Sequence, residues 1–138
     1  MKLNTIISIH ALLLLGFGIA FALYGPLMLA LFTIPETLEI DALTYWHLAA
    51  FARMFGAALF GLGILLFALR SSIQKLDRTN QRGIAFSLLL ANAMGLMVSL
   101  TQQTSVWQTQ AGWISSGIFA LLLLAYIYII ARPASTFE

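Results

Sequence analysis

Four long apolar runs, at about residues 4–24, 43–69, 83–102 and 106–130, constrain the fold of this chain most strongly. Three of them contain no charged residue, and the second contains only Arg53. An α-helix rises about 1.5 Å per residue, so roughly 20 apolar residues cross the hydrocarbon core of a bilayer. We therefore predict an all-α integral membrane protein with a single domain, residues 1–138, in which four transmembrane helices form a bundle.

The composition supports this prediction and excludes several classes of protein. Apolar residues make up 61% of the chain and charged residues 9%, whereas soluble domains average about 45–50% and 25%. The absence of cysteine rules out disulfides, thiolate metal sites and cysteine nucleophiles. A formal charge of +2 is too small for a nucleic-acid-binding surface, so we expect no nucleic-acid partner.

The charged residues outside the runs predict an orientation. With four crossings, six basic residues fall on one side of the membrane: Lys2, Arg70, Lys75, Arg78, Arg82 and Arg132. Three acidic residues, Glu36, Glu39 and Asp41, fall on the other side. The positive-inside rule then places both termini in the cytoplasm, and we expect a bacterial inner membrane. Ala20-Phe21-Ala22 resembles a signal cleavage site, but the long first run favours a retained helix.

The connection between the first two runs has two interpretations. Gly25-Pro26 is a strong helix-breaking signal, and the apolar stretch that follows is too short to cross a bilayer. This stretch either prolongs the first helix beyond a kink or forms a short helix in the interface. We favour the interfacial alternative.

Small residues spaced four apart predict how the helices pack, because helices in lipid associate where small side chains let their backbones approach. Each run has at least one such pair: Gly16/Ala20 and Gly18/Ala22 in the first, Ala57/Gly61 in the second, Ala91/Gly95 in the third and Gly112/Ser116 in the fourth.

Arg53 and Asn92 are the most conspicuous polar residues inside the runs. Arg53 lies seven residues after Trp46 and thus about 10 Å deeper than this interfacial residue. Its side chain can extend toward the outer interface and pair with the loop acids Glu36, Glu39 or Asp41. It can also bind an anionic headgroup or a partner subunit. Antiparallel packing brings Asn92 within about 5 Å of the depth of Arg53, so we predict an intramembrane Arg53–Asn92 contact.

The two histidines suggest a pigment or metal hypothesis. His10 and His47 lie roughly 20 Å apart along the membrane normal, so they cannot ligate one haem iron. Either could singly ligate a chlorophyll-type pigment, although a neutral hydrogen-bonded histidine is the commoner case. The acids of the outer loop with His47 match no established metal-ligand spacing, so we predict no metal site.

Catalytic equipment is sparse in this sequence. No carboxylate lies inside any run, which removes the usual proton relay or cation-coupling group. Among the serines, Ser99 shares its depth with His47, but a serine near a helix end usually bonds its own backbone. We therefore expect a protein that is not an enzyme.

One segment of the second run carries a family resemblance. The sequence reads Arg53-Met-Phe-Gly56-Ala-Ala-Leu59-Phe-Gly61-Leu-Gly63 and follows a proline-bounded outer loop. This run, with the four-span layout, resembles small bacterial four-helix membrane proteins grouped as DoxX-like. The resemblance implies a four-helix bundle. The acidic residue expected near the arginine in that group is absent here, so no quinone-linked redox role is carried over.

Two functions remain as expectations. The first is a non-catalytic accessory or assembly subunit of a larger membrane protein complex, for example a respiratory or photosynthetic one, which binds lipid, quinone or pigment between complexes. The second is a freestanding small transporter, or a protein that binds lipids or small molecules, with Arg53 and Asn92 as its polar site. The sequence requires no cofactor, and its expected partners are membrane lipids and other membrane subunits.

Overall fold

The computed structural model describes residues 3–32 and 41–131, and these are almost entirely helical. The helices are α1 (Leu3–Phe32), α2 (Ala42–Gln74), α3 (Arg78–Gln102) and α4 (Gln110–Ala131), with a π-helical turn, η2 (Gln103–Trp107), between the last two. All four α-helices are long and apolar enough to cross a membrane, which confirms the predicted number of long apolar helices within the described residues. Membrane insertion of these helices agrees with the composition.

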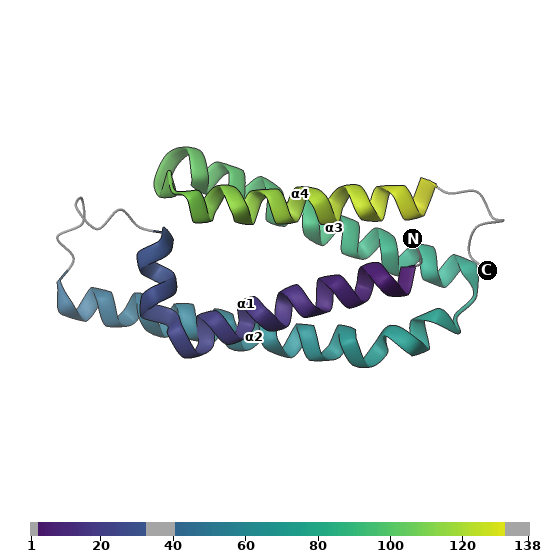
Figure 1. Cartoon of the computed structure of the whole chain (residues 1–138), viewed down its shortest axis with the longest axis horizontal. Coiled ribbons are helices and arrows are strands. Elements are labelled where there is room, and N and C mark those ends of the chain that lie inside the picture. Colours follow the sequence, from purple (N-terminus) through teal and green to yellow (C-terminus); the bar gives the residue numbers. More distant parts are fainter. Residues whose placement is uncertain (1–2, 33–40, 132–138) are drawn as a thin grey trace.

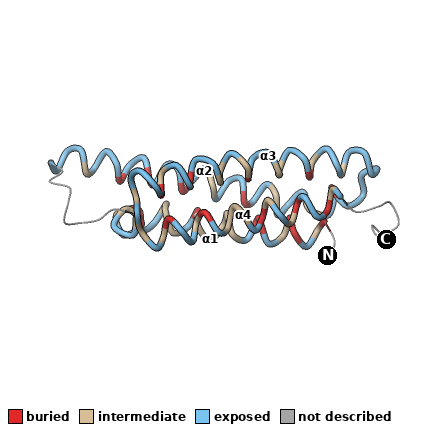
Figure 2. The backbone as a smooth tube through the Cα atoms, turned by 90° about the horizontal axis from the view of Figure 1, so that it is seen from above, coloured by how far each residue is buried: buried red, intermediate tan, exposed pale blue. Residues whose placement is uncertain are grey.

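The helices form two antiparallel pairs. α1 packs along α2, α3 packs along α4, and contacts between α1 and α4 join the pairs (Figures 1 and 2). The basic residues Arg70, Lys75, Arg78 and Arg82 flank the α2–α3 turn at the end where α1 begins, which we call the N-terminal end. The opposite end, where α1 ends and α2 begins, is called the far end.

A kink bends α1 near the far end. Tyr24 has non-helical backbone angles (φ −115°, ψ 33°), and Pro26 follows within the helix. Proline is tolerated there because it falls in the first turn after the break, where its missing N–H has no helical partner to lose. Residues 25–32 continue as a helix that turns across the bundle toward η2 (Figure 1). The segment thus prolongs the first helix beyond a kink, which is the interpretation that we did not favour.

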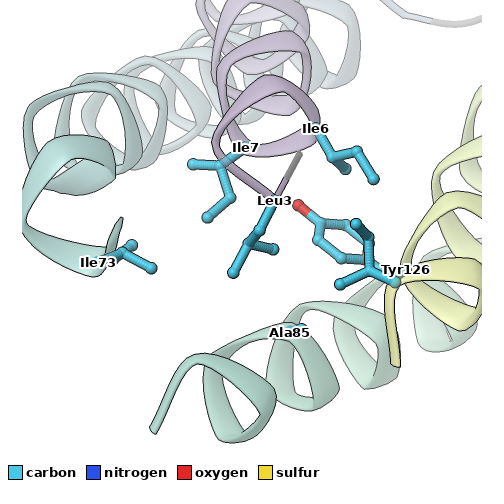
Figure 3. Close-up of a cluster of buried hydrophobic side chains, with 7 residues drawn as sticks. Leu3, Ile6, Ile7, Ile73, Ala85 and Tyr126 are labelled. Atoms are coloured by element: carbon cyan, nitrogen blue, oxygen red, sulfur yellow. The ribbon is translucent and has the colours of Figure 1, made fainter. Parts of the chain in front are cut away.

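The core lies at the N-terminal end. Side chains from α1, α2, α3 and α4 meet there in one buried cluster: Leu3, Ile6, Ile7, Ile73, Ala85, Tyr126 and Ile129 (Figure 3). Tyr126 and Ile7 are completely buried. Elsewhere α2 and α3 each bury a single stripe of residues, and most of their other residues are exposed (Figure 2). This exposure of apolar side chains is expected where lipid or another protein covers them.

Small residues bring α1 and α2 into close contact, but only some of the predicted pairs are used. A Cβ at Gly18 would lie 2.6 Å from the Phe60 backbone nitrogen, and one at Gly63 would lie 2.9 Å from the Leu15 nitrogen. The Gly18/Ala22 prediction is therefore confirmed at Gly18. On α2, the prediction of Ala57/Gly61 is wrong, because a Cβ at Gly61 would lie within 4 Å of no other helix that the structure describes and Ala57 is exposed.

The small residues that α2 buries against α1 have a different spacing. Ala49, Gly56 and Gly63 are seven residues apart and lie against α1. A seven-residue repeat returns to nearly the same helix face after two turns, so it keeps one face on a neighbouring helix over a longer distance than a single four-residue pair. On α4, the predicted pair Gly112/Ser116 is buried, as expected.

Candidate functional site

His10 and Tyr126 form a buried hydrogen bond between α1 and α4. The Tyr126 hydroxyl oxygen lies 3.0 Å from His10 Nδ1, and Figure 3 shows this hydroxyl directed toward α1. The hydroxyl has no other hydrogen bond to a residue that the structure describes. A buried hydroxyl leaves its proton unpaired unless it donates, so we assign Tyr126 as the donor and Nε2 as the protonated nitrogen of His10. His10 is thus the hydrogen-bonded histidine of the commoner interpretation.

The burial of His10 disfavours its role as a pigment ligand. Only 7% of the residue is exposed, whereas an axial ligand must present a free ring nitrogen to the face of a macrocycle. His47 is exposed near the start of α2, and its pigment hypothesis stays a prediction. Within residues 3–32 and 41–131, no cluster of three or more His, Asp or Glu side chains could hold a metal ion.

Asn92 lies on the buried stripe of α3 and does not bond Arg53. Its side-chain amide donates to the Leu88 carbonyl oxygen of its own helix (2.7 Å). Its Oδ1 atom is buried and accepts no hydrogen bond among the described residues. The predicted Arg53–Asn92 hydrogen bond is therefore wrong. The prediction used depth along the helices alone, but α2 packs mainly on α1 and α3 packs mainly on α4.

Arg53 is exposed on α2 beside the kink of α1. A Cβ at Gly25 would lie 3.1 Å from Arg53 Cγ, so the aliphatic part of the side chain crosses α1 where Gly25 leaves space. The guanidinium forms no hydrogen bond or ion pair with any residue in the described ranges. Glu36 and Glu39, its predicted partners, lie outside the described residues.

Asp41, the third predicted loop partner of Arg53, caps α2 instead. Its carboxylate accepts hydrogen bonds from the Thr44 hydroxyl (2.6 Å) and from the Thr44 backbone N–H (3.1 Å). Both bonds favour the ionised form and lower the pKa of the Asp41 carboxyl, the hydroxyl bond most strongly. An aspartate before the first helical residue is the usual capping arrangement, so the prediction of an Asp41 ion pair is not supported.

Three polar side chains between α3, η2 and α4 were not singled out as a group from the sequence. The hydroxyl oxygens of Ser99 and Ser116 lie 2.7 Å apart, and Ser116 also donates to the Gly112 carbonyl oxygen. Gln103 is buried and donates to the Thr109 carbonyl oxygen, which closes the π-helical turn. Ser99 is therefore a structural residue of the α3–α4 contact. The sequence does offer one signal for this group. Ser99 lies seven residues after Asn92, a spacing that places both side chains on the same face of α3.

An open apolar groove lies in the bend of α1. It has a volume of about 250 Å³ and is lined by Leu12, Leu13, Gly16, Phe17, Ala20 and Met28. A Cβ at Gly16 would lie within 4 Å of no other helix that the structure describes. The predicted small-residue pair Gly16/Ala20 thus forms part of this groove and is not covered by any helix that the structure describes.

Comparison with known proteins adds no functional information. No protein-family model, curated protein or solved structure matches this chain.

Proposed function

We propose that this protein is a non-catalytic accessory or assembly subunit of a larger membrane protein complex. In this proposal it resides in the bacterial inner membrane with both termini in the cytoplasm. The gathering of Arg70, Lys75, Arg78 and Arg82 at the N-terminal end supports this orientation through the positive-inside rule.

The uncovered groove in α1 is the observation that carries the proposal. Helices associate in lipid mainly through close backbone approach at small residues, and Gly16 and Ala20 provide such a surface without a partner helix. The groove volume of about 250 Å³ is below the roughly 300–1,000 Å³ of most small-molecule sites. Its lining side chains are all apolar. These properties favour the side chains of an apolar transmembrane helix over a ligand with a polar head.

The test is affinity purification from native membranes in a gentle detergent, with mass spectrometry and an absorption spectrum of the eluate. The variant is Gly16→Leu, which fills the groove. Gly117→Leu is the matched control, because Gly117 also has no atom within 4 Å and its neighbours four residues away are Trp113 and Leu121.

We expect larger subunits to co-purify at a fixed ratio with the wild type and with Gly117→Leu, and to be lost with Gly16→Leu. The absorption spectrum reports any pigment or quinone in the complex. A colourless homo-oligomer without other subunits contradicts the proposal. That result would favour the second candidate, a freestanding protein that binds lipids, for which the exposed Arg53 is the specific observation.

A further inference from the structure

Arg53 projects from α2 on the flank that faces away from the aromatic cluster at the far end. In that cluster, Phe21 contacts Phe55 at 5.5 Å and Phe32 at 6.0 Å between ring centroids. Phe32 in turn contacts Trp107 at 4.9 Å. Residues two apart on a helix point about 200° apart. Arg53 therefore leaves α2 on the flank opposite Phe55, and its side chain is exposed.

The stem of Arg53 passes close to Gly25 of α1. At Gly25, a Cβ would lie 3.1 Å from Arg53 Cγ and 3.4 Å from the Ala49 carbonyl oxygen. A methyl group at position 25 would shift the arginine stem by only a few tenths of an ångström, whereas a leucine side chain would occupy the space of the stem. Gly25 directly follows the non-helical residue Tyr24. The space that the Arg53 side chain occupies beside Gly25 is therefore at the kink.

The charge of Arg53 is not balanced within the part of the chain that the structure describes. Arg70 shows the contrast, because its guanidinium lies 3.5 Å from the centroid of the Phe67 ring and donates to the Phe67 carbonyl oxygen. Arg53 has neither kind of contact among the described residues. Arginine remains protonated in proteins, and an uncompensated charge in hydrocarbon is costly.

The depth of Arg53 suits a lipid headgroup. It lies seven residues from Trp46, about 10 Å along the helix, and an arginine side chain can extend several ångströms toward the interface. Its planar guanidinium can donate two parallel hydrogen bonds to two oxygens of one phosphate group. Phospholipid phosphates are the anions that lie next to an exposed flank of a transmembrane helix.

We propose that Arg53, seated on Gly25, binds the phosphate group of an anionic phospholipid in the leaflet at the far end. This inference deepens the second candidate function, lipid binding at Arg53. It does not rest on the accessory role, because the site shares no residue with the groove around Gly16. Its ligand chemistry is a phosphate group attached to a diacyl lipid.

The experiment is native mass spectrometry of the full-length, delipidated protein in detergent, titrated with three probes. These are phosphatidylglycerol, diacylglycerol with the same acyl chains, and inorganic phosphate. We expect one phosphatidylglycerol site with an affinity at least tenfold above that of diacylglycerol. Arg53→Gln should weaken the binding of phosphatidylglycerol about tenfold, which corresponds to the loss of charge-assisted hydrogen bonds.

Two further variants separate the site from a general effect of charge. Arg70→Gln removes the same charge from the same helix and should leave phosphatidylglycerol binding unchanged. Gly25→Leu keeps the charge but displaces the stem, so it should weaken binding nearly as much as Arg53→Gln.

Several outcomes would overturn the proposal. Equal binding by wild type and Arg53→Gln removes the site. Binding of inorganic phosphate as tight as that of the lipid identifies a soluble anion as the ligand and overturns the lipid assignment. Lipid binding that appears only after the double substitution Glu36→Gln and Glu39→Gln shows that the loop acids neutralise Arg53 in the native protein. Loss of co-purifying subunits in Arg53→Gln, with lipid binding unchanged, assigns Arg53 to a partner protein.

Discussion

At the scale of single residues, the hydrogen bond between His10 and Tyr126 is a buried polar contact between α1 and α4. We expect Tyr126→Phe to lower the free energy of unfolding by about 0.5–1.5 kcal/mol, because buried hydrogen bonds contribute this much and those in membranes fall at the low end. The measurement is reversible unfolding in mixed micelles of detergent and denaturing surfactant. Tyr45→Phe is the control, since the Tyr45 hydroxyl has no hydrogen bond to a described residue.

A double-mutant cycle makes this prediction specific to the pair. In a His10→Leu background, Tyr126→Phe should lower the free energy of unfolding by less than it does in the wild type, because the hydrogen bond is already absent. Equal losses in both backgrounds would assign the effect of Tyr126→Phe to packing alone.

The same residues show what the sequence reveals about sites. The burial of Asn92 and the hydrogen-bonded state of His10 follow from polar side chains in apolar runs, which seek hydrogen bonds. The partner Tyr126 could not be chosen from the sequence, because depth along a helix does not fix which face meets which neighbour. Arg53 and Asn92 were matched by depth, and they fail to bond because their helices pack on different partners.

At the scale of helices, the contact between α1 and α2 depends on glycine at position 56. A Cβ at Gly56 would lie 2.7 Å from the Phe21 carbonyl carbon and 2.8 Å from the Gly18 carbonyl oxygen. These are backbone atoms, so α1 itself would have to move. We expect Gly56→Ala to destabilise the protein by about 1–3 kcal/mol through overpacking. Gly61→Ala on the same helix should not lower the free energy of unfolding, because a Cβ at that position would lie within 4 Å of no other helix that the structure describes. Equal effects in the same unfolding assay would show that the helices adapt to the added methyl group.

Helix positions were predictable from the sequence, but helix-packing faces were only partly so. The four helices follow from the length of the apolar runs. The caps of α2 and α3, Asp41 and Asp77, were not predicted, although both fit the ordinary preference for aspartate before the first helical residue. In contrast, Gly18 and Gly16 both begin small-residue pairs, yet only Gly18 lies against α2. Every apolar run rich in glycine and alanine offers several such pairs, and the choice among them is made by the combined packing of whole helices.

At the scale of the whole molecule, the two helix pairs meet at both ends by different means. At the N-terminal end they share the cluster around Ile7 and Tyr126. At the far end, the segment of α1 after the kink reaches η2 through the contact between Phe32 and Trp107. An aromatic pair of this kind contributes about 0.5–1.5 kcal/mol, far less than a buried core. The far end should therefore open before the N-terminal end.

This asymmetry predicts the effect of Trp107→Ala. Because the chain contains no cysteine, pairs of introduced cysteines can carry spin labels at chosen positions. One pair, at Leu43 and Gln110, reports the distance between the helix pairs at the far end. The other pair, at Ser71 and Ala131, reports the distance at the N-terminal end. All four positions are exposed.

Trp107→Ala should broaden and lengthen the distance distribution at the far end while leaving the one at the N-terminal end unchanged, because the core cluster does not involve Trp107. Trp113→Ala is the matched control, since Trp113 is 58% exposed and has no aromatic contact among the described residues. If Trp107→Ala altered both distributions equally, the two helix pairs would move as one rigid unit. The Phe32–Trp107 contact would then be a consequence of the arrangement of the helix pairs and not a cause of it.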